Sequence, residues 1–406
     1  MQNKIYFLLF FLILFWAYCL YWPLKRQKKI DTPVDFFIYG RQMPSWVFAL
    51  VATGTIFSGW IFIAHPSLIF ANGFPFAMTS LSVIIIPLIG VLVMKRQWML
   101  SKRFGFVTPG EMISTYFRSD IIRILIVVIT LLFAVPFLAL QLSFAGKLIS
   151  VVSDGVIGAG SGSLLMGTVI ITCMGLIGMR STIYVDTLQF FLFLFGVVAL
   201  GFVAYDLVGG WDLLNESLSR VSNIKEKMHN INLNYASYLS LPGTLKTAES
   251  LDKNIFYNGT WTASMVLTFS FALTGILLSP NFSMLTFSSK EVQPFASQQA
   301  WFSGLLIGFI SIFFTLAIGV GSIFLGANNV INKTGNNISN VLPSNVFPDN
   351  LDMLIPHLIN LIGDYSPIFF SILIICAIAS FQLTGNFYLS SSAIITRDLI
   401  KKFFFK

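Results

Sequence analysis

Apolar runs of membrane-spanning length recur along almost the whole chain, and this feature restricts its fold more than any other. A spanning helix needs about 20 mainly apolar residues. Nine segments qualify, at 4–22, 46–70, 77–94, 121–151, 164–178, 183–208, 261–285, 299–325 and 368–396. Because 56% of the 406 residues are hydrophobic and only 10% are charged, a soluble core could not enclose so much apolar surface. We therefore expect an all-α polytopic membrane protein embedded in a lipid bilayer.

The basic residues predict the orientation of the chain. They flank the apolar segments, so the positive-inside rule explains the net charge of +8 better than a nucleic-acid partner does. The basic run at 25–29 places the first loop in the cytoplasm, and the residues at 95–103, Arg180, Lys290 and the basic tail fall on the same side. We expect a multi-pass protein of the inner (cytoplasmic) membrane, with its N-terminus outside and Lys406 inside.

The segment 54–76 carries residues that a plain lipid-facing helix would not. Gly59 lowers helix propensity and Pro66 removes a backbone donor, so the helix is expected to break between Phe62 and Pro66. Broken backbone at membrane depth is tolerated where it lines a cavity or a ligand site. With the ionisable His65 in the same turn, the segment is a candidate binding site. The alternative is a proline-kinked packing helix with a hydrogen-bonded histidine.

Polar residues also gather on three further spans. They are Pro136, Gln141, Ser143 and Lys147 in the fourth span, Ser279, Pro280, Asn281, Ser283 and Thr286 in the seventh, and Ser380, Gln382, Thr384, Asn386 and Ser390 to Ser392 in the ninth. The fourth span is expected to be interrupted at Pro136 and the seventh at Ser279–Asn281. Any one of these side chains could simply hydrogen-bond between helices, but together they favour one shared polar cavity.

The positions of these interruptions indicate an inverted repeat. The second and seventh spans are both broken at proline, and the fourth and ninth are both unusually long. Discontinuous helices in an inverted-topology repeat are typical of secondary transporters. The predicted division is 1–30 as an extra N-terminal helix with a basic loop, 31–208 as a first five-helix repeat, 209–260 as an external loop, and 261–406 as a second repeat of three helices. The incomplete second repeat suggests a truncated reading frame or a divergent minimal form, and a polar external loop is expected at 326–367.

Several motifs resemble those of the sodium/solute symporter family, which includes the proline permease and bacterial sugar symporters. They are DFFIYGRQMPSW before the second span, SGW at 58–60, GMRSTIYVDTLQ entering the sixth span and SSSAIITRDL closing the ninth. FIAHPSLIF, KRFGFVTPGEM, AVPFLALQL and SPNFSMLTFSS look most like the monocarboxylate permease branch. The resemblance runs from about residue 35 to the end of the chain.

The resemblance implies the leucine-transporter fold and a function. The chain would be a cation-coupled symporter that imports a small organic solute, such as a monocarboxylate or a similar anion or zwitterion, by alternating access. The substrate would lie between the two helix breaks. The implied substrate-binding residues are Ser58, Gly59, Trp60, His65, Gln141, Pro280, Asn281 and Ser283.

The resemblance also implies a sodium site, in which this sequence departs from the family pattern. The family's backbone carbonyls would fall near Gly54, Phe57 and Ala379. Its adjacent pair of hydroxyls would fall at Gln382 and Leu383, or one residue earlier, and neither register supplies two hydroxyls.

A second sodium-related replacement is Ile56, which stands where proline permeases carry an acid. Hard cations take several oxygen ligands, so a sodium site would be weak unless Gln382, Thr384 or Ser380 substitutes. Coupling to Na⁺ therefore has a rival in proton coupling through His65, whose ring can titrate near neutral pH.

Other functional classes are less consistent with the residues. A transporter-like sensor would need a signalling domain, and nothing like a histidine kinase follows Lys406. An inactive truncated transporter stays open. An enzyme is not expected, since the chain has only three histidines, no HExxH and no paired carboxylates within spans, and no catalytic residue is assigned. Asp186 and Gln189 are interpreted as helix-cap or gate residues.

The cysteines do not indicate a site. Cys19, Cys173 and Cys376 all lie within apolar spans, where cysteine behaves as a small hydrophobic residue. Their spacing matches neither a disulfide framework nor a zinc site.

Overall fold

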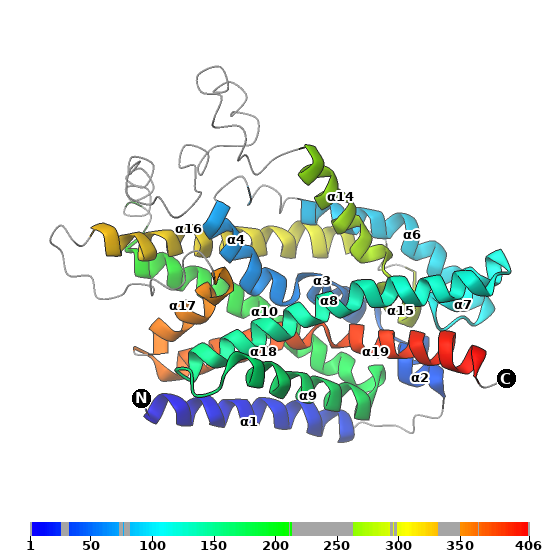
Figure 1. The fold of residues 1–406 in the computed structure, drawn as a ribbon, viewed down its shortest axis with the longest axis horizontal. Coiled ribbons are helices and arrows are strands. Elements are labelled where there is room, and N and C mark those ends of the chain that lie inside the picture. Colours follow the sequence, from blue (N-terminus) through cyan, green and yellow to red (C-terminus); the bar gives the residue numbers. More distant parts are fainter. Residues whose placement is uncertain are drawn as a thin grey trace, which may run out of the picture.

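The computed structural model describes residues 2–25, 32–72, 82–210, 263–292, 299–331, 350–363 and 365–404, together with Phe76, Asp212 and Phe295. These residues form a bundle of helices that run largely along one common direction (Figure 1). In chain order the α-helices are α1 (Gln2–Lys25), α2 (Pro33–Ile38), α3 (Ser45–Gly59), α4 (His65–Asn72), α6 (Ser82–Phe104), α7 (Pro109–Phe117), α8 (Asp120–Val152), α9 (Ala159–Ile177), α10 (Met179–Val208), α14 (Ala263–Leu278), α15 (Pro280–Ser288), α16 (Phe309–Ile331), α17 (Leu354–Gly363), α18 (Pro367–Gln382) and α19 (Gly385–Ile394). Wider π-helical segments occupy Trp60–Ala64, Gln299–Gly308 and Ile395–Lys401, and short 3₁₀ turns occupy Tyr39–Arg41 and Leu351–Met353.

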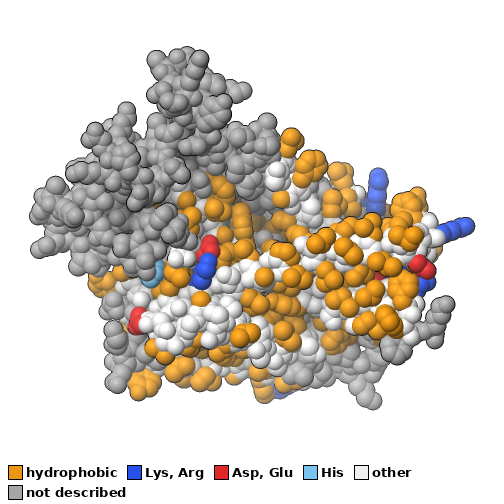
Figure 2. All heavy atoms as spheres, in the orientation of Figure 1, with side chains coloured by type: hydrophobic (Ala, Val, Ile, Leu, Met, Phe, Trp, Pro, Cys, Tyr) orange, Lys and Arg blue, Asp and Glu red, His pale blue; other side chains and the backbone are white. Residues whose placement is uncertain are grey.

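The polytopic membrane architecture is confirmed. Five helical stretches of the described chain are long and apolar enough to cross a membrane. They are Ser45–Ala71, Asp120–Val152, Thr182–Val208, Leu305–Ser322 and Pro367–Lys401. Figure 2 shows hydrophobic side chains spread across the visible described surface, with only a few charged side chains among them. The larger number of nine spans stays a prediction.

The stretches around α3 and α18 form the centre of the bundle. Every residue of α3 from Val47 to Gly59 is buried, and so is α18 from Leu373 to Gln382. By contrast α8 and α10 expose large apolar side chains such as Leu132 and Phe202, as expected for helices that face lipid on one side. Two helices that carry predicted polar residues are therefore enclosed by the rest of the protein.

The first helix break lies one turn earlier than predicted. Ser58, with φ 38° and ψ −155°, interrupts α3, whereas the chain is helical from Trp60 through Pro66 to Asn72. In the π-helical segment, the amide of His65 donates to the carbonyl of Trp60, five residues back. This wider turn allows Pro66, which has no amide donor, to enter α4 without ending the helix.

The second break agrees with the prediction, and a third predicted interruption is wrong. α14 ends at Leu278, and α15 starts at Pro280 with Ser279 as its N-cap, whose hydroxyl accepts the amide hydrogen of Phe282 at 3.3 Å. Pro136 does not interrupt α8, which is continuous over 33 residues. A proline removes one hydrogen bond of the helical ladder, and the bonds on both sides of it can hold a long helix together.

Two predicted segment limits also differ from the structure. α6 continues to Phe104, ten residues past the predicted end at 94, because helical hydrogen bonding persists after the chain leaves the apolar zone and its basic residues face outward. The predicted polar loop 326–367 contains α17, and the face of α17 with Leu354, Ile355 and Leu358 is buried. The predicted external loop 209–260 lies almost wholly outside the described residues.

The ends of the described chain lie at opposite ends of the bundle (Figure 1). This arrangement agrees with termini on opposite sides of a membrane. Which end faces the cytoplasm remains a prediction, and so does the division of the chain into two repeats.

Candidate functional site

The break in α3 forms a polar contact with α8. The side-chain amide of Gln141 donates to the hydroxyl of Ser58 at 3.4 Å, and both side chains are at most 1% exposed. Among the described residues, no donor reaches Gln141 Oε1. A Cβ on Gly59 would clash with Gln141 Oε1 and would lie 2.5 Å from the ring of Phe381 in α18. The predicted residues Ser58, Gly59 and Gln141 therefore do meet, at the crossing of three helices.

The break between α14 and α15 forms a second polar contact, with α19. The side-chain amide nitrogen of Asn281 lies 2.8 Å from Ser390 Oγ, 2.7 Å from Ser391 Oγ and 3.1 Å from the carbonyl of Phe387. Asn281 Oδ1 accepts no hydrogen bond from the described residues. Pro280 occupies the first helical position, and the first amides of α15 give this helix end its partial positive charge.

Packing between α8 and α19 connects the two polar contacts. Phe387 packs with its ring centroid 5.1 Å from that of Phe137 and 5.8 Å from that of Phe133. Phe137 lies one helical turn before Gln141 on α8, so the Asn281 contact and the Ser58 contact are neighbours along this helix. Ser283 bonds back to the carbonyl of Ser279 at 3.2 Å and so supports its own helix.

His65 faces a different helix, α16, and the ring of Trp60 lies beside the imidazole. Their ring centroids are 5.3 Å apart, and His65 Nδ1 lies 2.8 Å from Thr315 Oγ1. The imidazole is completely buried, and the ring of Phe76 lies 6.0 Å from it. Of the two roles considered for His65, hydrogen bonding between helices accounts for this arrangement.

The predicted sodium position offers few oxygen ligands. A Cβ on Gly54 would lie 3.1 Å from both methyl groups of Leu383, so a hydrophobic side chain fills this space. Gln382, a possible substitute for the missing hydroxyls, is already engaged, because its Oε1 accepts a hydrogen bond of 2.6 Å from Gln189 of α10. The carbonyl of Ala379 accepts from the amide of Leu383 at 3.1 Å. Gln382 Oε1 and the Ala379 carbonyl thus each already accept a hydrogen bond, and the sodium ligands at this position stay a prediction.

A buried carboxylate that the sequence interpretation dismissed lies close by. Asp186 is completely buried, and Asn386 Nδ2 donates to its Oδ2 at 3.0 Å. No described donor reaches Asp186 Oδ1 or Asn386 Oδ1. Asp186 does not cap α10, which begins at Met179, about two turns earlier, and the interpretation of Asp186 as a gate contact stays a prediction.

Asp186 and Gln189 form one polar face of α10 against the junction of α18 and α19. Gln189 pairs with Gln382 before the junction, and Asp186 pairs with Asn386 after it. The signal that could have identified this face was the spacing of three between two polar residues inside an apolar span. The partners are almost 200 positions away, so the sequence did not reveal them.

Charged residues join two of the resemblance motifs, KRFGFVTPGEM and SSSAIITRDL, at the end of the bundle that contains α7. Asp398, which is buried, accepts hydrogen bonds from Thr108 at 2.8 Å and from Arg123 at 2.9 Å. Arg397 pairs with Glu111 at 2.7 Å, and Thr108 and Glu111 form a capping box that starts α7. These contacts fasten α7 to α8 and to the segment after α19.

The motif before α3 is fastened to the same end of the bundle. Arg41 Nη1 donates to the carbonyl of Ser101 at 2.5 Å, and Nη2 donates to that of Phe106 at 2.9 Å. Burial lowers the pKa of the Arg41 guanidinium, and the negative charge of Glu111 opposes this effect. Arginine stays charged under such a shift, so Arg41 acts as a fixed cationic anchor.

Comparison with known proteins identifies the relatives of this chain. A family model described as "Sodium:solute symporter family" matches residues 36–406. A protein of Rhizobium johnstonii named "Monocarboxylate transport permease protein" is 25% identical over 122 residues, which cover 29% of this chain. That match spans 25% of the length of the curated relative.

A solved structure gives a fuller match. It is titled "Substrate-bound outward-open state of a Na+-coupled sialic acid symporter reveals a novel Na+-site". The match has a TM-score of 0.70 at 15% identity and covers 98% of this chain and 75% of that one. At this identity the likeness shows the fold, and it confirms the predicted leucine-transporter-like fold.

Proposed function

The chain belongs to the sodium:solute symporter family, and on that basis we propose that it imports a small organic solute across the membrane by alternating access, driven by a sodium gradient. Family membership agrees with the prediction that the chain is not an enzyme. The observation that carries the proposal is the pair of interrupted helices, broken at Ser58 and at Ser279, in the buried interior of a membrane protein. Helix breaks at membrane depth are where transporters of this architecture bind solutes and ions.

The solute site lies between the two polar contacts described above. Gln141, Asn281 and the hydroxyl of Ser58 are all at most 4% exposed, so the structure represents a conformation in which this site is closed to solvent. Buried oxygens without donors, such as Gln141 Oε1 and Asn281 Oδ1, suit a ligand that carries hydroxyl or N–H groups.

The proposed solute class is a small monocarboxylate or a similar anion or zwitterion. The N-terminal end of α15 at Pro280 carries amides and a partial positive charge, which favour a carboxylate. The name of the Rhizobium johnstonii relative supports the same class. His65 is less suited to direct contact with the solute, because its imidazole is bonded to Thr315 of α16, and the ring of Trp60 lies beside it.

We place the coupling cation at Asp186 and Asn386. The two oxygens without described donors belong to a buried carboxylate and a buried amide, which are ligand types that hard cations take. When bound, a sodium ion would neutralise the carboxylate in the membrane interior. The residues themselves hold α10 against the start of α19, so cation binding would bear on the packing of these two helices.

Uptake by the purified 406-residue chain in proteoliposomes tests the proposal. Radiolabelled pyruvate, lactate, a neutral amino acid and a neutral sugar are each offered under a sodium gradient, a pH gradient or no gradient. We expect uptake of a monocarboxylate under the sodium gradient. Robust uptake of the sugar with no carboxylate uptake would contradict the solute class, and sodium-independent uptake that follows the pH gradient and vanishes in His65→Ala would favour proton coupling.

Substitution of Asp186 tests the cation site separately. In Asp186→Asn the cation loses its anionic ligand, so we expect the sodium concentration for half-maximal uptake to rise about tenfold or more, the factor for one charged interaction of roughly 1.5–3 kcal/mol. Asp154→Asn, at an exposed loop position, is the matched control. If Asp186→Asn leaves the sodium dependence unchanged, the assignment of the cation site to Asp186 is wrong. The proposed solute class does not depend on that result.

A further inference from the structure

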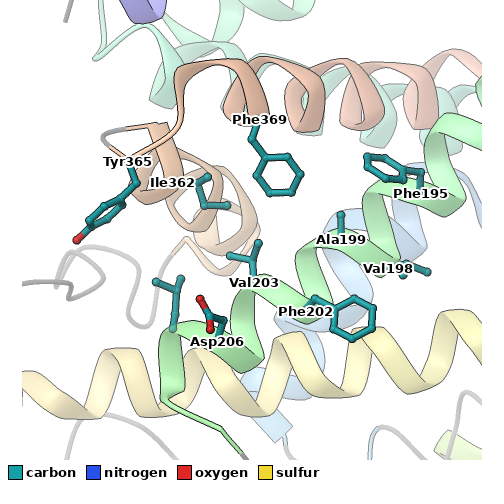
Figure 3. A pocket seen from close by; sticks show the side chains of 10 residues that line it. Phe195, Val198, Ala199, Phe202, Val203, Asp206, Ile362, Tyr365 and Phe369 are labelled. Carbon is teal, nitrogen blue, oxygen red and sulfur yellow. The ribbon is translucent and has the colours of Figure 1, made fainter.

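A cavity of about 830 Å³ lies on the side of the bundle, between α10 and the α17–α18 corner. In Figure 3, Phe369 of α18 and Ile362 of α17 extend toward Ala199 and Val203 of α10. Its volume is in the range of about 300–1,000 Å³ that is usual for small-molecule sites. It shares no lining residue with the candidate solute and cation sites.

The lining is polar at one end only. Phe195, Ala199 and Val203 line the cavity with apolar side chains, whereas Asp206 and Tyr365 supply a carboxylate and a phenol (Figure 3). Asp206 is exposed, and no described cation forms an ion pair with it. The cavity is therefore apolar along its length, and a carboxylate without an ion-pair partner among the described residues lies at its end.

The dimensions match one leaflet of a bilayer. Asp206 lies two residues before the end of α10 at Val208, and Phe195 lies eleven residues deeper in the apolar span. At about 1.5 Å per residue the cavity extends about 16 Å along the helix. Half of a bilayer's hydrocarbon core is about 15 Å thick. An acyl chain along α10 would thus place its headgroup near Asp206.

We propose that this cavity binds a phospholipid whose headgroup carries a primary ammonium group, such as phosphatidylethanolamine. One acyl chain lies between Val203 and Phe369, and the ammonium group donates a hydrogen bond to the carboxylate of Asp206. Charge-assisted hydrogen bonds of this kind are stronger than neutral ones. A choline headgroup has no N–H donor, and the net negative charge of a glycerol headgroup is repelled by the carboxylate. The site therefore selects among lipids by headgroup chemistry.

The bound lipid would lie against helices that also position the proposed cation site. α10 carries Asp186, and α18 leads into α19, which carries its partner Asn386. A lipid between α10 and α18 would therefore contact one helix of the Asp186–Asn386 pair and the helix that leads to the other. The lipid proposal does not rest on the identity of the transported solute or cation.

Native mass spectrometry of the full 406-residue chain measures this binding directly. The protein is titrated in detergent with phosphatidylethanolamine, phosphatidylcholine or phosphatidylglycerol of identical acyl chains. We expect one phosphatidylethanolamine to be retained at least about tenfold more tightly than either of the others, the factor for one charge-assisted hydrogen bond. Equal retention of all three lipids would overturn the proposal.

Two kinds of variant test the headgroup contact and the acyl-chain contact with the cavity separately. Asp206→Asn should remove the preference for phosphatidylethanolamine and leave weak binding of all three lipids, whereas Asp154→Asn should keep the preference. Ala199→Trp should fill the cavity and abolish tight lipid binding. If this variant does not fold, the smaller substitution Ala199→Leu replaces it in the test, and it should weaken lipid binding. If Asp206→Asn keeps the preference for phosphatidylethanolamine, or if both Ala199 variants bind lipid as the unsubstituted chain does, the assignment is rejected. It is also rejected if the protein is a dimer and the Ala199 variants abolish dimer formation, because the cavity would then be a contact between two copies of the chain.

Discussion

Gly59 is the residue on which the approach of α3, α8 and α18 depends. A side chain there would meet Gln141 Oε1 and the ring of Phe381, and both neighbours are buried. The preceding residue, Ser58, takes a positive φ that side chains rarely adopt. The local backbone is thus arranged so that a carboxamide of α8 reaches the break in α3.

We predict that Gly59→Ala destabilises the protein by about 1–3 kcal/mol, the range for overpacking a filled interior. The same change should reduce uptake, since it displaces Gln141 from Ser58. Gly160→Ala is the matched control, because this helical glycine of α9 has open space around the position of a Cβ. Thermal-unfolding midpoints and initial uptake rates measure both effects. Equal behaviour of the two variants would show that the crossing is not tightly packed.

At the scale of elements, an ion pair joins the turn before α17 to α8. Lys147 Nζ lies 2.5 Å from Asp352 Oδ2, just before α17, and the two side chains are 22% and 35% exposed. The buried face of α17 packs on α18, α8 and α4, so α17 covers one end of these three helices. The ion pair therefore links this covering helix to the helix that carries Gln141.

We predict a coupling energy of about 0.2–1 kcal/mol between Lys147 and Asp352, the range for partly exposed ion pairs. The coupling should fall as salt is raised, because exposed charges are screened. A double-mutant cycle with Lys147→Ala and Asp352→Ala, followed by thermal unfolding, measures it. The control cycle uses Asp120 and Lys402, which are 58% and 40% exposed and should couple more weakly. Stronger coupling in the control pair would contradict the prediction.

At the scale of the whole molecule, the enclosed helices explain where polar groups can exist. α3 and α18 are surrounded by protein, and the polar contacts of Ser58, Asn281, Asp186 and Gln382 all lie inside this enclosure. The outer helices α8, α9 and α10 face lipid with apolar side chains. Polar groups at membrane depth are costly outside such an enclosure, so the site depends on the complete packing of the bundle.

We predict that position 220 faces the outside and position 290 the cytoplasm. Arg220→Cys and Lys290→Cys are introduced separately and labelled in intact cells with a membrane-impermeant maleimide. Only the variant at 220 should react before permeabilisation. The native Cys19, Cys173 and Cys376 are at most 9% exposed, so they should give little background. Labelling at 290 from outside, or protection at 220, would reverse the orientation.

Hydropathy and proline position alone were enough to predict the membrane class, the approximate positions of the helices and the break at Ser279. These properties are local, because apolar length decides whether a helix can span and Pro280 starts α15 wherever the rest of the chain lies. Local motifs likewise predicted the family and the meeting of Ser58, Gly59 and Gln141.

Packing alone decided the remaining features. Pro136 stays within α8 and Pro66 within α4, while Ser58, a residue with no strong breaking tendency, interrupts α3. Whether a helix breaks depends on the neighbours that take over its unpaired backbone groups. For the same reason, the pairing of Asp186 with Asn386 followed from no local pattern: two side chains 200 positions apart become partners only when the helices that carry them pack together.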